Sequence, residues 1–344
     1  MPHCFQTGLL IAAFALSPFI RTAAAQSVGE FYRGNRITVI VATPAGGGYD
    51  VNARTLVRHL SRHIPGNPGM VVQNMPGADG MLGANNVYNV AAQDGTVIGV
   101  GTRTTAFAPL FGLAGARYDV GRIAWLGSTA TETGVAVAWQ TAPVKTAADL
   151  FKTELIIGAG STGGDFYVFP YVLNGLLGTK FKIVGGYSGL PSLGLAMERG
   201  EIQGVGNYTW TTLIASHADW IADKKIALLM QFGLTRHPDL PAVPLAMDFA
   251  KTDPQRSLLS IFMSMKAFGF PFFVGPNVPA DRVAALRTAF METMRDPQFV
   301  AEMRQQHNEV SPTSGEEMQV ALKAIYSQPP ELLAKARALM PQKK

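Results

Sequence analysis

The feature that most constrains this chain is an apolar stretch that runs into three consecutive glycines and then into residues with helical spacing. Residues 36–43, RITVIVAT, predict a buried strand. After the loop PAGGGYD, apolar residues recur at the spacing of one helix face, at Val51, Leu56, Val57, Leu60 and Ile64. A strand, a glycine loop and a helix in this order are typical of a parallel sheet that is covered by helices.

The same alternation continues along the chain. GMVVQNMPGADGM predicts a second strand with a Gly/Pro loop, LGANNVYNVAA a helix, and TVIGVGT a third strand. RIAWLGSTATETGVAVAW predicts one long strand, and the strand patterns ELIIGAG, KFKIVGGYSG and EIQGVGN alternate with helices predicted over 165–177 and 193–199. Two long helices are predicted near the end of the chain, over 279–306 and 314–340.

A chain of 344 residues is too long for one core and suits two domains. We expect an α/β architecture in which each domain is a mostly parallel sheet flanked by helices. The first domain is predicted over 26–127 plus 245–344 and the second over 128–244. Two strands then cross between the domains and form a hinge, with a ligand cleft between the two parts.

The first 25 residues have the pattern of a secretion signal. GLLIAAFALSPFI is an apolar core of signal-peptide length, and an A-x-A site follows, so cleavage is predicted near Ala25. The only cysteine, Cys4, lies in this leader, so the mature chain contains no disulfide. No membrane-spanning stretch is expected after cleavage.

The charge balance argues against nucleic acid as a partner. Because Arg21 leaves with the leader, 28 Lys and Arg face 24 Asp and Glu in the mature chain, a formal charge of +4. This small excess is spread thinly, which favours small anionic ligands over a nucleic-acid surface.

The glycine loop suits an anion. PAGGGYD is not a P-loop, because no G-K-[ST] follows Gly48, and it lacks the third glycine of a dinucleotide fingerprint. It offers unobstructed backbone N–H groups at a helix N-terminus, with Asp50 as the predicted N-cap. The alternative is that the glycines only form a tight turn.

A second glycine pattern occurs in IIGAGSTG, where Gly158, Gly160 and Gly163 match G-x-G-x-x-G. A dinucleotide site also needs an acidic residue about 20 positions further on. Residues 171–190 contain no Asp or Glu, so the pattern favours a simple anion loop over an NAD-binding enzyme.

Sequence patterns for metal binding and catalysis are weak. RHLSRH places His59 and His63 one helical turn apart, but Arg58 and Arg62 flank them, and we expect a solvated basic face. No nucleophile elbow or catalytic cysteine is present. We therefore expect no enzyme activity, no cofactor and no metal.

Several of these motifs, in order, resemble those of the substrate-binding receptors of the tripartite tricarboxylate transporter family, also called Bug receptors. The motifs are PAGGGYDVNAR, VVQNMPGADGMLGANNV and AAQDGTVIGVG, then GSTGGDFYVFPYVL with GYSGLPSLGLAMERGEIQG, and finally FVGPNVPADRVAALRTAF with DPQF. The resemblance spans almost the whole mature chain. It implies a two-domain periplasmic-binding-protein (venus-flytrap) fold with a carboxylate held largely by backbone amides and waters.

The resemblance also implies which residues bind the ligand. In the first domain they belong to two loops: Pro44, Ala45, Gly46, Gly47, Gly48, Tyr49 and Asp50, then Thr102, Arg103, Thr104 and Thr105. In the second domain they are Ser161, Thr162, Gly163 and Gly164, followed by Tyr187, Ser188 and Gly189.

Two positions depart from the family pattern. Gln203 stands in GEIQ where the family usually has GEVD, and a neutral amide repels an anion less than a carboxylate does. Arg103 is the other departure; it can clamp a carboxylate or face solvent at the rim of the cleft. Aromatic residues near these loops can line the ligand: Tyr49, Phe166, Tyr187, Tyr208 and Trp210. For Phe166 and Trp210 the alternative is packing in the core.

The resemblance thus implies a receptor that takes up a small organic acid in the periplasm of a Gram-negative cell. We expect a monomer that is not embedded in the membrane and that delivers its ligand to membrane permease subunits. The alternatives are a receptor that signals to a sensor protein and an NAD-binding enzyme.

Overall fold

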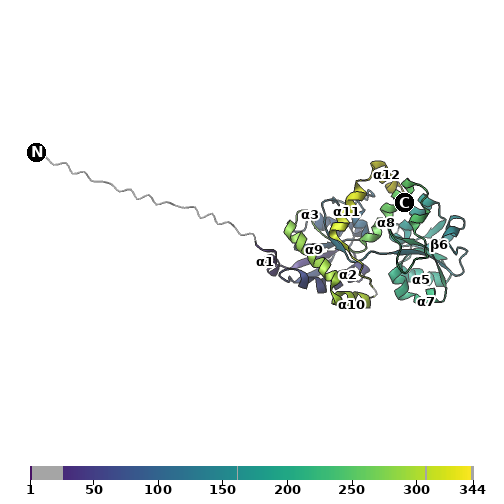
Figure 1. The fold of residues 1–344 in the computed structure, drawn as a ribbon, viewed down its shortest axis with the longest axis horizontal. Helices are drawn as coiled ribbons and strands as arrows, with labels where there is room; N and C mark the ends of the chain where they lie inside the picture. Colours follow the sequence, from purple (N-terminus) through teal and green to yellow (C-terminus); the bar gives the residue numbers. More distant parts are fainter. Residues whose placement is uncertain (2–25, 161, 307, 342–344) are drawn as a thin grey trace.

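The computed structural model describes residue 1 and residues 26–160, 162–306 and 308–341. The predicted signal peptide and Cys4 lie outside these residues. Two lobes are visible in Figure 1, one containing α2, α9 and α10 and the other containing α5, α7 and β6. Each lobe is built on one sheet.

The first sheet has the strand order β11-β4-β10-β3-β1-β2. Strands β1, β2 and β3 run parallel to one another, whereas β10 is antiparallel to both of its neighbours. The strands of this sheet are β1 (Ile37–Val41), β2 (Met70–Asn74), β3 (Val97–Val100), β4 (Ala124–Ser128), β10 (Pro271–Val274) and β11 (Thr313–Ser314).

The second sheet has the order β7-β6-β8-β5-β9. Strand β6 is parallel to β7 and β8, and β5 is antiparallel to β8 and β9. The strands of this sheet are β5 (Gly134–Trp139), β6 (Leu155–Gly158), β7 (Phe181–Val184), β8 (Gly204–Thr209) and β9 (Ile226–Phe232).

The helices occupy the connections between strands. The α-helices are α1 (Val28–Arg33), α2 (Gly48–Leu60), α3 (Met81–Asn89), α4 (Asp165–Leu177), α5 (Leu190–Glu198), α6 (Trp210–Ser216), α7 (Ala218–Ala222), α8 (Asp253–Ser264), α9 (Ala280–Arg295), α10 (Pro297–Gln305), α11 (Gly315–Tyr326) and α12 (Pro330–Ala338). The 3₁₀-helices are η1 (Ser61–His63), η2 (Ala78–Gly80), η3 (Arg103–Ala106), η4 (Ala147–Phe151), η5 (Ala246–Phe249) and η6 (Met265–Phe268). None of the described helices is both long and apolar enough to cross a lipid bilayer.

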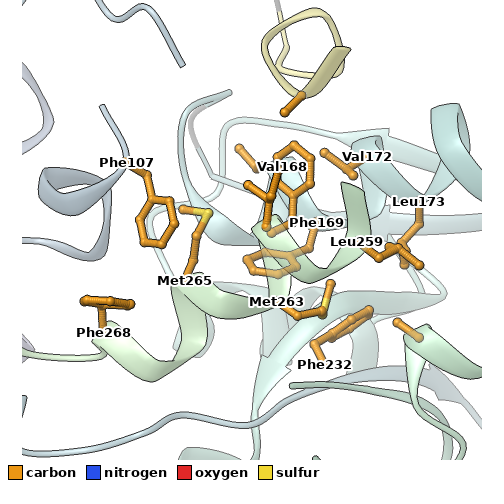
Figure 2. Close-up of a cluster of buried hydrophobic side chains, with 14 of the residues drawn as sticks. Phe107, Val168, Phe169, Val172, Leu173, Phe232, Leu259, Met263, Met265 and Phe268 are labelled. Atoms are coloured by element: carbon orange, nitrogen blue, oxygen red, sulfur yellow. The ribbon is translucent and has the colours of Figure 1, made fainter. Parts of the chain in front are cut away.

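The two lobes share a hydrophobic core where η3, α4, α8 and η6 meet. Phe107 packs edge-on against Phe268, with ring centroids 5.4 Å apart, and Phe169 of α4 lies 5.8 Å from Phe232 of β9. Figure 2 shows these rings together with Met263 and other aliphatic side chains in one continuous cluster. Burial of this apolar surface holds the lobes together on the side of the molecule formed by α8 and η6.

Two connections between the sheets lie side by side. One is residues 129–133, between β4 and β5, and the other ends in η6, just before β10. The Glu132 amide donates to the Lys266 carbonyl at 3.0 Å, and Gly269 packs directly on the Ala130 backbone. The division of the chain into domains at residues 127 and 245 stays a prediction.

Three details differ from the sequence-based predictions. The stretch 122–139 is two strands in different sheets, because β4 pairs with β10 whereas β5 pairs with β8 and β9. Both long helices are interrupted, the first at Asp296 before Pro297 and the second before Pro330, since proline cannot continue the helical hydrogen bonds. Each sheet is mixed, because antiparallel strands return the chain between the domains.

The predicted solvated basic face is wrong. His59 lies 2.6 Å from the Glu302 carboxylate, and His63 lies 2.9 Å from that of Asp296. Arg58 and Arg62 pair with the same two acids. This ion-pair cluster joins α2 and η1 to α10. Its two acids, Glu302 and Asp296, are more than 230 positions away from the histidines in the sequence and meet them only in the folded protein.

Candidate functional site

A cavity of about 380 Å³ opens where the carboxyl ends of β1, β2 and β3 face the N-terminus of α4. Parallel strands direct their following loops to the same sheet edge, which is where ligands bind in open α/β folds. The lining residues are Ala42, Thr43, Pro44, Tyr49, Pro76, Gly77, Asp79, Gly80, Thr102, Arg103, Thr104, Gly163, Gly164 and Asp165. A second cavity of about 390 Å³ adjoins it and shares Asp79, Thr104, Gly163 and Asp165.

The glycine loop forms one border of the cavity. Gly46 has φ +80°, which favours glycine, and Gly47 is the N-cap of α2. The prediction that Asp50 is the N-cap is therefore wrong: Asp50 lies in the first turn, where its carboxylate accepts from the Gly46 amide at 2.8 Å and the Asn74 side chain at 2.8 Å. Arg54 also donates to it, and these bonds hold the pKa of Asp50 below its usual value against the effect of burial.

The loop after β3 forms the opposite border. The Arg103 amide donates to the Tyr49 hydroxyl at 3.3 Å, and the Thr102 amide donates to the buried Thr105 hydroxyl at 3.0 Å. The Tyr49 ring packs edge-on against Phe270 at 5.1 Å. Burial raises the pKa of Tyr49, so its hydroxyl stays protonated at neutral pH. The backbone of this loop is thus tied to the glycine loop.

Arg103 is neither a free clamp nor a solvent-facing residue. Its guanidinium pairs with Asp165 at the start of α4 and with Glu132 in the first crossing segment. The three side chains are only 15%, 18% and 12% exposed. Both predicted alternatives for Arg103 missed this pairing because its two acidic partners come from other parts of the chain.

Lys266 completes the network. Its ammonium group lies 3.6 Å from the Asp165 carboxylate, donates to Asn207 at 3.1 Å and sits over the Phe169 ring at 4.5 Å. Burial lowers the pKa of Lys266, against the attraction of Asp165. Burial alone would raise the pKa of Asp165, but Arg103 and Lys266 hold it below its usual value. Two cations therefore balance two carboxylates across the contact between the lobes.

Two hydrogen-bonding groups at the cavity have no partner among the described residues. They are the Thr43 hydroxyl and Nε of Arg103, and both atoms are buried. Leaving a buried donor unsatisfied costs about 1–3 kcal/mol.

The structure brings together seven of the residues that the resemblance implied. Those lining the cavity are Pro44, Tyr49, Thr102, Arg103, Thr104, Gly163 and Gly164. Thr162 lines the adjoining cavity, and Ser161 lies outside the described residues. Ala45, Gly46, Gly47 and Gly48 are exposed beside the cavity, whereas Asp50 and Thr105 are buried behind it.

The remaining implied residues do not line this cavity. The loop containing Tyr187, Ser188 and Gly189 lies against the glycine loop after β6, where the Tyr187 amide donates to the Ala159 carbonyl at 3.1 Å. The Gln203 side chain accepts from the Ile156 amide at 3.0 Å, at the other end of the second sheet.

Two of the candidate aromatic residues belong to the core of the second sheet. Tyr208 is 1% exposed, and burial raises its pKa to about 12. Trp210 is buried in the same core and borders a different cavity, next to His237. Of the two alternatives predicted for Trp210, packing in the core is therefore the one that the structure shows.

Several residues of the site were not predicted. Asp79 stands in the Gly/Pro loop after the second strand, so the convergence of parallel strand ends could have placed it. Lys266 is the single charge in the apolar run 257–275, which is a signal for a buried, partnered lysine. Glu132 carries no comparable signal. Within the described residues, no three His, Cys, Asp or Glu side chains are grouped so as to hold a metal ion.

Comparison with known proteins gives a likeness in fold. No protein-family model and no curated protein matches the chain. A TctC solute-binding protein from Polaromonas is 18% identical over 90% of this chain and 98% of its own, with a TM-score of 0.67. The periplasmic binding protein BugD is 20% identical over 90% and 99%, with a TM-score of 0.62. MatC from Rhodopseudomonas palustris, with bound malate, is 20% identical over 89% and 99%, with a TM-score of 0.58. The predicted two-domain periplasmic-binding-protein fold is confirmed.

Proposed function

We propose that this protein is a solute-binding receptor of the tripartite tricarboxylate transporter type, which captures a small organic carboxylate in the cavity between its two lobes. The observation that carries the proposal is a cavity bordered by loops from both sheets, with Thr43 in its lining and the exposed glycine loop at the N-terminus of α2 beside it. The likeness in fold to a TctC protein and to MatC with malate supports the same class of ligand.

The energetics suit such a ligand. Hydrogen bonds to a charged group contribute about 1.5–3 kcal/mol each, and micromolar affinity needs about 8 kcal/mol net. Backbone amides of the glycine loop and of the α2 N-terminus can supply this free energy after the cost of ordering. A cavity of about 380 Å³ is within the usual range for small-molecule sites.

Capture by closure is part of the proposal. We propose that the lobes rotate about two connections, residues 129–133 and η6; the second of these lies about 20 residues beyond the boundary predicted at residue 245. Closure would present the loaded form to membrane permease subunits. We place the protein in the periplasm, after cleavage of the leader near Ala25, and we assign it a binding role without catalysis.

The first experiment is a thermal-unfolding screen of the purified protein against mono-, di- and tricarboxylates and NAD(P). A ligand at 100 times its dissociation constant adds about 2.7 kcal/mol to the free energy of unfolding. We expect at least one carboxylate to raise the melting temperature by a few degrees and NAD(P) to have no effect. A response to NAD(P) alone would contradict the receptor role.

Thr43→Val tests the assignment of the cavity. The Thr43 hydroxyl has no protein partner among the described residues, so the substitution should leave the unliganded stability unchanged or slightly higher. The affinity for the carboxylate should fall by about tenfold to a hundredfold, as measured by calorimetry. Thr38→Val, in β1 and outside the cavity, is the matched control. Equal affinities for the two variants would remove Thr43 from the site.

A further inference from the structure

We infer that the ion pair between Arg103 and Asp165 is a latch that holds the two lobes closed when no ligand is bound. The inference rests on the lobe rotation of the proposed function and specifies which contact opposes that rotation. Arg103 departs from the family pattern, so the latch is a feature of this chain.

The pair joins the two lobes directly. Arg103 lies in η3, just after β3 of the first sheet, and Asp165 is the first residue of α4, which packs on β7 and β8 of the second sheet. Both residues line the same cavity, and the guanidinium donates to the carboxylate across the contact between the lobes. Among the described residues, no other hydrogen bond or ion pair links the loops after β1, β2 and β3 to α4 or to the second sheet. Rotation of α4 away from these loops therefore has to break this pair.

The surroundings of the pair make it strong. An ion pair at the surface contributes little, because water and salt screen it. The side chains of Arg103 and Asp165 are instead largely buried. A charge-assisted hydrogen bond in such a place shifts an equilibrium by about tenfold to a hundredfold. One such contact is enough to make the closed form the dominant one.

The other two charges of the network allow the latch to open without leaving an unpaired ion. Arg103 keeps its second partner, Glu132, in the connection 129–133. Asp165 keeps Lys266, whose ammonium group lies 3.6 Å away. Lys266 also donates to Asn207 of β8 at 3.1 Å, so its ammonium group stays with the second lobe. Breaking a buried ion pair is most costly when it leaves an uncompensated charge, and here each half of the network stays neutral. Opening is therefore reversible.

The latch determines how the receptor meets its ligand. With the pair formed, most molecules are closed, and a ligand enters through the less populated open form. The latch raises the fraction of molecules in the form that holds the ligand, and the apparent affinity scales with that fraction.

The test is a distance measurement between spin labels on the two lobes, made on the purified mature protein without ligand. The only cysteine of the chain, Cys4, lies in the predicted leader, so the labels attach only at introduced positions. Val90→Cys, at the end of α3, and Leu195→Cys, in α5, change exposed residues in opposite lobes (Figure 1). We expect one dominant distance in the otherwise native protein.

Three variants separate the latch from a general effect of charge. Asp165→Asn removes the charge that the second lobe contributes, so a second distance should appear and its ratio to the first should rise by at least about tenfold. Arg103→Met removes the same pair from the first lobe and should act in the same direction. Glu132→Gln is the matched control, because it removes a carboxylate from the same arginine but leaves the contact between the lobes, so the native distribution should persist.

The outcomes are distinct. A second distance in Asp165→Asn and Arg103→Met, but not in Glu132→Gln, supports the latch; Asp165→Asn alone is sufficient if Arg103→Met does not fold. The inference is overturned if the native protein already shows both distances equally, if Asp165→Asn keeps the native distribution, or if Glu132→Gln changes it as much as Asp165→Asn does. No ligand is present in these measurements, so an overturned latch leaves the receptor role to the thermal-unfolding screen.

Discussion

Replacing Arg103 by methionine removes the cation that joins two carboxylates from different parts of the chain. Asp165 begins α4, Glu132 lies in the crossing between the sheets, and both side chains are less than 20% exposed. Removing one partner of a buried ion pair costs about 3–5 kcal/mol. Lys266, 3.6 Å from Asp165, compensates one of the two acids, so we expect a loss near the lower limit, about 3 kcal/mol at pH 7.

The loss should depend on pH in a definite direction. In the native protein, Arg103 and Lys266 hold the Asp165 pKa below its usual value although burial opposes them. A depressed carboxyl pKa stabilises the fold above the unfolded-state pKa of about 3.9, and this stability is lost as pH falls through the lower folded-state pKa. Without Arg103 the effect of burial raises the pKa of Asp165. Protonation of Asp165 then removes the unpaired buried charge in the variant. The difference in free energy of unfolding between the variant and the native protein therefore becomes smaller between pH 7 and pH 4.5.

The assay is urea denaturation followed by tryptophan fluorescence, without added ligand, at pH 7 and pH 4.5. Arg117→Met is the control, since Arg117 is exposed and forms hydrogen bonds to described residues only through its backbone atoms. This substitution should change the free energy of unfolding by less than about 0.5 kcal/mol. A deficit for Arg103→Met below about 1 kcal/mol at pH 7, or an equal deficit at both pH values, would refute the reasoning that the pair is buried and coupled.

Two further predictions concern stability. In Gly99→Ala, the added Cβ lies 2.5 Å from the buried Phe273 ring, so we expect the free energy of unfolding to fall by about 1–3 kcal/mol and the melting temperature to drop. Gly34→Ala is the control, because the nearest atom to its added Cβ is 3.9 Å away, and its melting temperature should change little. Equal melting temperatures for the two variants would contradict the packing around Gly99. In Asp296→Asn, the contacts to Arg62 and His63 that lower the Asp296 pKa against burial are weakened. We expect the free energy of unfolding to fall by about 1.5–3 kcal/mol at pH 7, and this difference should become smaller as pH falls below about 4. Glu292→Gln, which changes a half-exposed partner of His63, is the control and should have a smaller effect. A difference that is constant with pH would argue against the ion pair.

The local pattern of the sequence was sufficient for most elements of the fold. The helix predicted over 165–177 is α4, with the same bounds, and the strand predicted over 36–43 contains β1. Apolar spacing and glycine positions act within a few residues, so a single sequence reports them directly. The loops around Pro44, Thr102 and Gly163 were predicted from the family resemblance, and they meet at one cavity because the carboxyl ends of parallel strands converge there.

Electrostatic partners were beyond the reach of the sequence. Nothing near Arg103 in the chain indicates Glu132 or Asp165, which are 29 and 62 positions away, and nothing near His59 indicates Glu302. The apolar pattern over 122–139 predicts one long strand. The structure has two strands there, because β4 pairs within the first sheet and β5 pairs within the second.

The sequence by itself determined the periodic elements, the glycine loops and the α/β class, since backbone conformation and apolar spacing are local properties. The tertiary structure decided which charges are neutralised, which donors remain free and that the Asp79 carboxylate faces the second lobe. Those properties depend on distances between groups from separate segments, and such distances exist only after the two sheets have packed together.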